Sequence, residues 1–185
     1  MGNSSTKLHF DPEDFLPDVL NGNMRAINTF LLTHKSYQLD YSALMSLFEK
    51  NLDNSYCCYL LGKLYLQSDF PLRDKDLGLR YLQFAATLGN AEAIKDLAAN
   101  YLKYLDVPPS YSDYSLIKEY CFQAMHLGDP NAISTYLSLC QNQRETQSGL
   151  NLFFECLQNE RLSLDSYDQL TRNGFEYLLD RAIVV

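Results

Sequence analysis

The sequence predicts an all-α fold in which antiparallel helical hairpins stack side by side as an α-solenoid. The chief observation is a stripe of one large apolar, one small and one aromatic residue, spaced so that all three share a helical face. The stripe recurs at a shift of 36 residues, first as Leu61, Gly62 and Tyr65 and then as Leu97, Ala98 and Tyr101. Self-similarity at a period of roughly 20–50 residues is typical of solenoids.

A second stripe closes each of these repeats. It consists of a tyrosine, two small or flexible residues and a glycine: Tyr81, Ala85, Ala86 and Gly89, then Tyr120, Ala124, Met125 and Gly128. Small residues let a neighbouring helix approach closely, and a glycine after the last turn is the usual left-handed stop. The sequence therefore predicts repeats over 54–89 and 90–128, and a degenerate third repeat over 130–159.

These residues resemble the Sel-like repeats (SLR), relatives of the tetratricopeptide repeats. The family pattern is A-x3-L-G-x2-Y, a variable loop, D-x3-A-x2-W and x3-A-A-x2-G-x3-A. It is matched by Leu61, Gly62, Tyr65, Asp74, Gly78, Tyr81, Ala85, Ala86, Gly89 and Ala93. Tyr81 replaces the family's tryptophan, and the loop glycines are missing between Gln67 and Arg73. The resemblance implies a right-handed solenoid acting as a scaffold in signalling, protein quality control or host manipulation by a pathogen.

At the N-terminus we expect a flexible tail over residues 1–10, followed by one solenoid domain over 11–185. The opening MGNSSTK matches the acceptor pattern for N-myristoylation, with Gly2 as the acylated residue. One acyl chain gives only reversible membrane contact, so acylation of Gly2 would make the chain a reversibly membrane-tethered regulatory protein. The alternative interpretation is a flexible polar tail or part of an expression scar.

Asp11 and Pro12 are expected to open a short helix that ends at Asn21 and Gly22. A diverged hairpin is then expected over 23–53, because its apolar residues follow helical spacing.

The central helices are expected near 54–67, 74–88, 90–105 and 112–127. Asp74 is the expected N-cap of the second of these helices, and Ser112 or Asp113 that of the fourth. The proline-containing loop 106–111 is either a rigid connector or an insertion that touches a partner. Residues 164–185 are expected to form a helix that caps the end of the stack.

Composition limits the classes of function. A formal charge of −8 disfavours nucleic acid as a partner. The five cysteines are odd in number and lack metal-type spacing, so reduced thiols and a cytoplasmic location are expected, in a host cell if the source is a pathogen. No apolar run is long enough to span a membrane, and acidic residues stand where a secretory signal would have its core.

Nothing in the sequence assembles a catalytic or metal site. The histidines His9, His34 and His126 are far apart, and Cys121 lies five residues before His126, a poor helical spacing for a nucleophile and its base. We therefore expect no enzyme activity, no metal and no cofactor. A Cys/His enzyme on a repeat scaffold is the alternative that a shared pocket for these side chains would favour.

The predicted function is a protein-interaction adaptor that binds a peptide or protein in a concave groove. In tetratricopeptide-type repeats the first helix of each unit lines that groove. The residues expected there are Tyr56, Tyr59, Lys63, Gln67, Glu92, Lys95, Lys103, Asn131, Ser134, Ser138 and Asn142. They suit an extended or helical acidic peptide. For Tyr56 and Tyr59 the competing interpretation is packing on the preceding hairpin, and the oligomeric state is left open.

Overall fold

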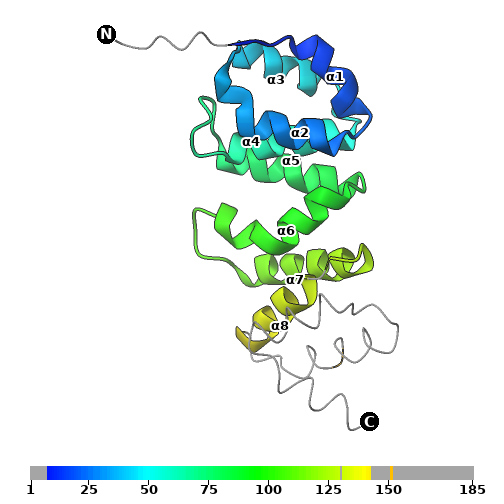
Figure 1. Cartoon of the computed structure of the whole chain (residues 1–185). Coiled ribbons are helices and arrows are strands. Elements are labelled where there is room, and N and C mark those ends of the chain that lie inside the picture. Colours follow the sequence, from blue (N-terminus) through cyan, green and yellow to red (C-terminus); the bar gives the residue numbers. More distant parts are fainter. Residues whose placement is uncertain (1–7, 130, 143–150, 152–185) are drawn as a thin grey trace. The chain divides into compact units, whose positions relative to one another are not determined.

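The structure is a computed structural model that describes residues 8–129, 131–142 and 151, and these residues are mostly helical (Figure 1). The α-helices are α1 (Pro12–Leu20), α2 (Met24–Thr33), α3 (Tyr41–Glu49), α4 (Ser55–Leu66), α5 (Lys75–Thr87), α6 (Ala91–Tyr104), α7 (Tyr111–His126) and α8 (Ala132–Asn142). The all-α character predicted from the sequence is confirmed at this level. The chain divides into two compact units, Met1–Ala93 and Ile94–Val185, and the division falls inside α6.

The first unit is built around α4. Helices α1, α2, α3 and α5 all pack against α4, and eight of its twelve residues are buried. The sequence SYCCYLLGKLYL is apolar on nearly every face, as a helix covered on all sides must be. The helix α4 is therefore the core element of this unit.

Two glycines bring α4 and α5 into close contact. A Cβ atom added at Gly78 of α5 would lie 2.8 Å from Leu66 Cγ and 3.0 Å from the carbonyl oxygen of Gly62 in α4. A Cβ added at Gly62 would lie 2.9 Å from the backbone nitrogen of Leu82. The backbones of this hairpin thus approach more closely than any side chain at these two positions would permit.

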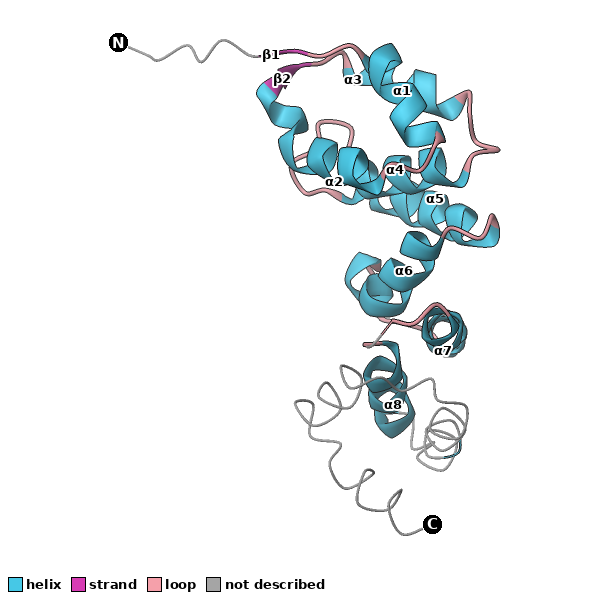
Figure 2. Cartoon of the chain, turned by 45° about the vertical axis from the view of Figure 1, so that its right-hand side comes forward, coloured by secondary structure: helices cyan, strands magenta, loops and turns pink. Residues whose placement is uncertain are grey.

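A short parallel ladder lies near the start of the described chain. Strand β1 (Leu8–His9) pairs with β2 (Tyr37–Gln38), with Leu8 opposite Tyr37, and the 3₁₀ turn η1 (His34–Ser36) leads into β2 (Figure 2). The sequence did not predict this ladder, whose first strand falls in the segment expected to be a tail. Two-residue strands carry no hydrophobic alternation that could be recognised.

In the second unit, α6 and α7 are joined by side-chain contacts. The rings of Tyr101 and Tyr120 lie 6.4 Å apart, and the Tyr101 hydroxyl donates to Asp113 Oδ1 at 3.2 Å. Helix α7 also packs against α8.

The helix ends follow the expected chemistry with one correction. Asp11 and Asp74 accept N-cap hydrogen bonds from Glu13 N and Leu77 N, as predicted. The N-cap of α7 is Ser110, not Ser112 or Asp113. Its Oγ accepts from Asp113 N, and the Asp113 carboxylate accepts from Ser110 N, which together form a capping box. The prediction was wrong by two or three residues, because several adjacent residues are good caps.

Several predicted features lie outside the described residues: Gly2 and its acylation, Cys156, most of the degenerate repeat 130–159 and the capping helix 164–185. Within the part of the chain that the structure describes, no helix is both long and apolar enough to cross a membrane.

Candidate functional site

The predicted groove residues of α4 are largely used inside the first unit. Tyr59 is only 6% exposed, because α4 is covered both by the helices before it, α1, α2 and α3, and by α5 after it. The ring of Tyr56 packs directly on Gly22, which has no side chain to keep it away. Both tyrosines thus pack inside the first unit, Tyr56 against a glycine that precedes the predicted hairpin 23–53, and their role in a groove stays a prediction. Lys63 and Glu92 are half-buried.

Gln67, the fourth predicted groove residue, belongs to a hydrogen-bond network around a buried histidine. His34 is fully buried, with its Nε2 2.7 Å from Gln67 Oε1 and its Nδ1 3.1 Å from the Tyr41 hydroxyl. Gln67 Nε2 donates to the carbonyl oxygen of Leu31 at 2.9 Å. Desolvation lowers the pKa of His34, the nearby charge of Lys35 lowers it further, and the bond to Gln67 opposes both. Gln67 therefore ties the end of α4 to α2 and η1, and both the oxygen and the nitrogen of its amide are engaged in this network.

The predicted groove residues of the second unit are more accessible. Lys103, Asn131 and Ser138 are exposed, Lys95 is half-buried, and Ser134 is buried with its hydroxyl donating to the carbonyl oxygen of Asn131 at 2.9 Å. Asn142 ends α8, and its side chain lies outside the described residues. The groove combines residues of both units and remains a prediction.

The structure does not bring the Cys121 thiol and the His126 imidazole together. Cys121 is fully buried with Sγ directed at the carbonyl oxygen of Ala98, while exposed His126 bonds through Nδ1 to the carbonyl oxygen of Phe122. Desolvation raises the pKa of Cys121 to about 12, so its nucleophilic thiolate form is scarce at neutral pH. No group of three or more metal-ligating side chains occurs among the described residues.

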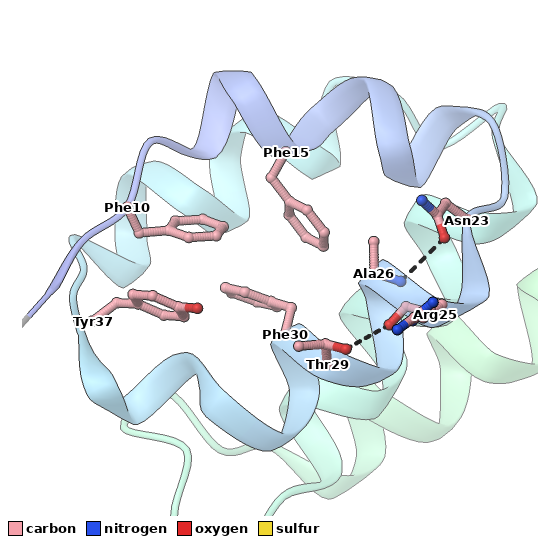
Figure 3. Close-up of a pocket in the computed structure, with 8 residues that line it drawn as sticks. All are labelled: Phe10, Phe15, Asn23, Arg25, Ala26, Thr29, Phe30 and Tyr37. Carbon is pink, nitrogen blue, oxygen red and sulfur yellow. Dashed lines mark hydrogen bonds between the residues drawn. The ribbon is translucent and has the colours of Figure 1, made fainter.

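A cavity of about 320 Å³ opens between α1, α2 and the ladder, and four aromatic rings form one side of it (Figure 3). The residues that line it are Phe10, Phe15, Asn23, Arg25, Ala26, Thr29, Phe30 and Tyr37. We refer to it as the aromatic pocket. Its volume is at the lower end of the range usual for ligand sites, about 300–1,000 Å³.

The aromatic wall is a continuous set of ring contacts. The centroid of Phe10 lies 4.9 Å from those of Phe30 and Tyr37, and the centroid of Phe15 lies 4.8 Å from that of Phe30. Phe15 and Phe30 are buried, whereas Phe10 and Tyr37 are half-buried and present their edges to the cavity. The ladder between β1 and β2 fixes this arrangement, because it holds the chain before Phe10 against the strand that carries Tyr37.

The opposite side of the pocket is polar and belongs to the start of α2. Asn23 caps the helix by accepting from Ala26 N at 3.2 Å, and the Thr29 hydroxyl donates to the carbonyl oxygen of Arg25 at 2.8 Å. Arg25 is exposed and is the single ionised residue among the lining side chains that the structure describes. The pocket can therefore receive an apolar ring and hold an anionic group beside it.

Sequence reasoning missed this pocket. The aromatic residues come from a loop, two helices and a strand, so no helical stripe or short motif links them. The available signal was an aromatic-rich N-terminal segment, which does not reveal which rings meet.

Comparison of the chain with protein-family models, with curated proteins and with solved structures gave no match. The resemblance to Sel-like repeats therefore rests on the sequence pattern alone.

Proposed function

We propose that the chain is a non-catalytic protein-interaction adaptor whose helical hairpins form a right-handed solenoid of the Sel-like type. The observation that carries the proposal is that the same two tyrosine positions meet in two successive hairpins. Tyr65 of α4 stacks on Tyr81 of α5, with centroids 5.8 Å apart, and the corresponding Tyr101 and Tyr120 meet at 6.4 Å. Contacts that recur with the sequence period are expected of repeats, whose main use is to present extended binding surfaces.

The ends of the two hairpins support the same proposal. Gly89 and Gly128 have positive φ angles of 79° and 77°. Asn90 N donates to the carbonyl oxygen of Ala85 at 3.0 Å, and Asp129 N donates to that of Ala124 at 3.0 Å. Both helices thus end in a left-handed turn with one hydrogen-bond pattern.

The thiols of the described residues favour a binding role over a catalytic one. Cys57, Cys58 and Cys121 are free and buried, and Cys140 is buried as well. Desolvation raises the pKa of Cys57 to about 12 and that of Cys58 to about 11, as it does for Cys121. Unreactive reduced thiols suit a packed scaffold in a reducing compartment, which agrees with the proposed cytoplasmic location.

Affinity capture from cells of the source tests the adaptor function. The full chain would be immobilised as the native protein, as Lys103→Glu combined with Asn131→Arg, and as the control Lys50→Glu. All three sites are exposed, and only the first two belong to the predicted groove. The expected result is a partner that the native and control chains retain and the double variant loses. That partner should then form a stoichiometric complex with the purified chain in size-exclusion chromatography. If no partner passes the second step, the adaptor function is wrong.

A further inference from the structure

We propose that the aromatic pocket is the binding site for a short extended peptide. The peptide inserts an aromatic side chain into the pocket, pairs an acidic side chain with Arg25 and packs an apolar side chain against Leu32. This inference deepens the proposed function and rests on it, because it names the kind of partner segment and the surface of the first unit that receives it. The adaptor groove and this pocket share no residue.

The pocket provides an anchor site for one aromatic ring. Phe15 and Phe30 are held by the core of the unit, while the edges of Phe10 and Tyr37 and the small side chain of Ala26 face the space (Figure 3). Aromatic rings favour edge-to-face or offset contact with other rings, and a buried aromatic anchor commonly supplies much of the energy of an interface. The rings are already in place, so a ligand does not have to order them on binding.

The polar groups of the pocket select for a negative charge. The amide of Asn23 is occupied by Asp18 and by the N-cap bond, and the Thr29 hydroxyl by the helix backbone. In contrast, within residues 8–129 and 131–142 the Arg25 guanidinium has no ion pair and the Tyr37 hydroxyl no hydrogen bond. Both groups can donate to a carboxylate, and a guanidinium can do so with two parallel bonds.

A third contact point lies farther along the same helix. Leu32 is 84% exposed, the most exposed of the large apolar side chains in the described chain. Arg25, Thr29 and Leu32 stand at positions i, i+4 and i+7 and so share one face of α2. Seven residues of α-helix span about 10 Å, the length of about three residues of extended chain. One small molecule seated in the cavity leaves Leu32 uncovered, whereas an extended peptide reaches both.

Fluorescence anisotropy with the full chain tests the proposal. The probes are two fluorescein-labelled nonapeptides with Gly and Ser flanks. The central sequence of one peptide is Glu-Trp-Ser-Leu, and that of the other is the reverse, Leu-Ser-Trp-Glu. Both are needed because the contacts determine the spacing of the three side chains but not the direction of the peptide chain. We expect one of the two peptides to bind. Its tryptophan-to-serine analogue should bind about thirtyfold more weakly, and Ala26→Tyr, which fills the cavity from the surface of α2, should abolish binding.

The charge contact has its own matched test. Arg25→Gln should weaken binding of the glutamate peptide about tenfold but leave the affinity for the glutamine analogue unchanged, whereas Lys50→Gln, at the C-cap of α3, should change neither. Leu32→Ser should weaken binding about threefold to tenfold.

Three outcomes would show that the aromatic pocket is not a peptide-binding site. The first is that neither peptide binds more tightly than its tryptophan-to-serine analogue. The second is that Arg25→Gln and Lys50→Gln change the affinity for the glutamate peptide equally. The third is that indole-3-propionate displaces the peptide with the same affinity as the peptide itself, which would make the site one for small carboxylates. Circular dichroism of each variant separates loss of binding from loss of folding. If the captured partner of the adaptor test is retained by Ala26→Tyr, the pocket assignment falls while the adaptor function stands.

Discussion

Gln67 Oε1 lies 2.7 Å from His34 Nε2, and this contact joins the end of α4 to the turn that follows α2. Gln67 Nε2 donates to the carbonyl oxygen of Leu31, so the amide oxygen must be the atom that faces the imidazole. His34 Nε2 therefore carries the proton, and Nδ1 accepts from the Tyr41 hydroxyl at 3.1 Å. A buried histidine with one defined tautomer thus connects three segments of the first unit.

Replacing Gln67 by leucine should destabilise the protein. The change leaves the His34 Nε2–H group and the Leu31 carbonyl without these side-chain partners, and an unsatisfied buried donor costs about 1–3 kcal/mol. The free energy of unfolding in urea at pH 7.5 measures the loss. The control is Gln38→Leu at an exposed position of β2, which should stay within about 0.5 kcal/mol of the wild type. Equal effects of the two substitutions would contradict the role of the network.

The same histidine makes stability depend on pH. Burial lowers the pKa of His34 from its ordinary value of 6.5, so between the lowered pKa and 6.5 the folded protein binds fewer protons than the unfolded chain. The free energy of unfolding should therefore be fully retained above pH 6.5 and fall as the pH decreases below it. Urea midpoints between pH 8 and 5 should fall more steeply for the wild type than for His34→Gln. An NMR titration that places the imidazole pKa above 6.5 would refute this.

Ser110→Ala should lower stability by about 0.5–2 kcal/mol, because it removes the N-cap of α7. Ser110 Oγ accepts from Asp113 N at 3.3 Å, and Ser110 N donates to Asp113 Oδ2 at 2.7 Å. Ser112→Ala is the comparison variant. Ser112 lies inside the first turn and its hydroxyl contacts Ser110 Oγ at 2.8 Å, so its loss should cost less than the loss of the cap itself. Thermal unfolding of both variants distinguishes the observed cap from the one predicted by sequence, and a larger loss for Ser112→Ala would reverse that assignment.

Gly78→Ala should be destabilising although alanine is the better helix former. The added methyl group would lie 2.8 Å from Leu66 Cγ and 3.1 Å from the Leu66 backbone nitrogen, so α4 and α5 would have to separate. Overpacking of this kind costs about 1–3 kcal/mol, more than the gain in helix propensity of about 1 kcal/mol. Gly89→Asn is the control: nothing lies within 4 Å of its Cβ position, and asparagine tolerates a positive φ. Denaturant unfolding that shows a gain for Gly78→Ala would disprove the close approach.

The sequence was sufficient to predict features that depend on nearby residues. The boundaries of α4 and α5 agree with prediction to one residue, because Asp74 and Gly89 mark helix ends through local hydrogen bonds and backbone conformation. The sequence left the burial of Tyr59 as one of two interpretations, and it did not predict the engagement of Gln67 with His34. Both depend on which helices cover α4, and the side-chain periodicity of α4 does not contain that information.

The aromatic pocket shows the same limit more strongly. Phe10 and Tyr37 are twenty-seven residues apart and meet only because two-residue strands pair beside them. A parallel ladder of two-residue strands has no sequence signature. The sequence therefore showed each aromatic residue but did not predict which of them are in contact.

Helix α4, with other helices packed around it, also determines how the molecule could be subdivided. The sequence marks residue 54 as the start of a repeat, yet a fragment excised there would lose α1, α2 and α3, three of the helices that pack against the apolar helix α4. Such a fragment should precipitate or self-associate, whereas one beginning at Leu8 keeps the helix enclosed. The repeat that the sequence pattern identifies most clearly is thus not expected to fold as an independent unit.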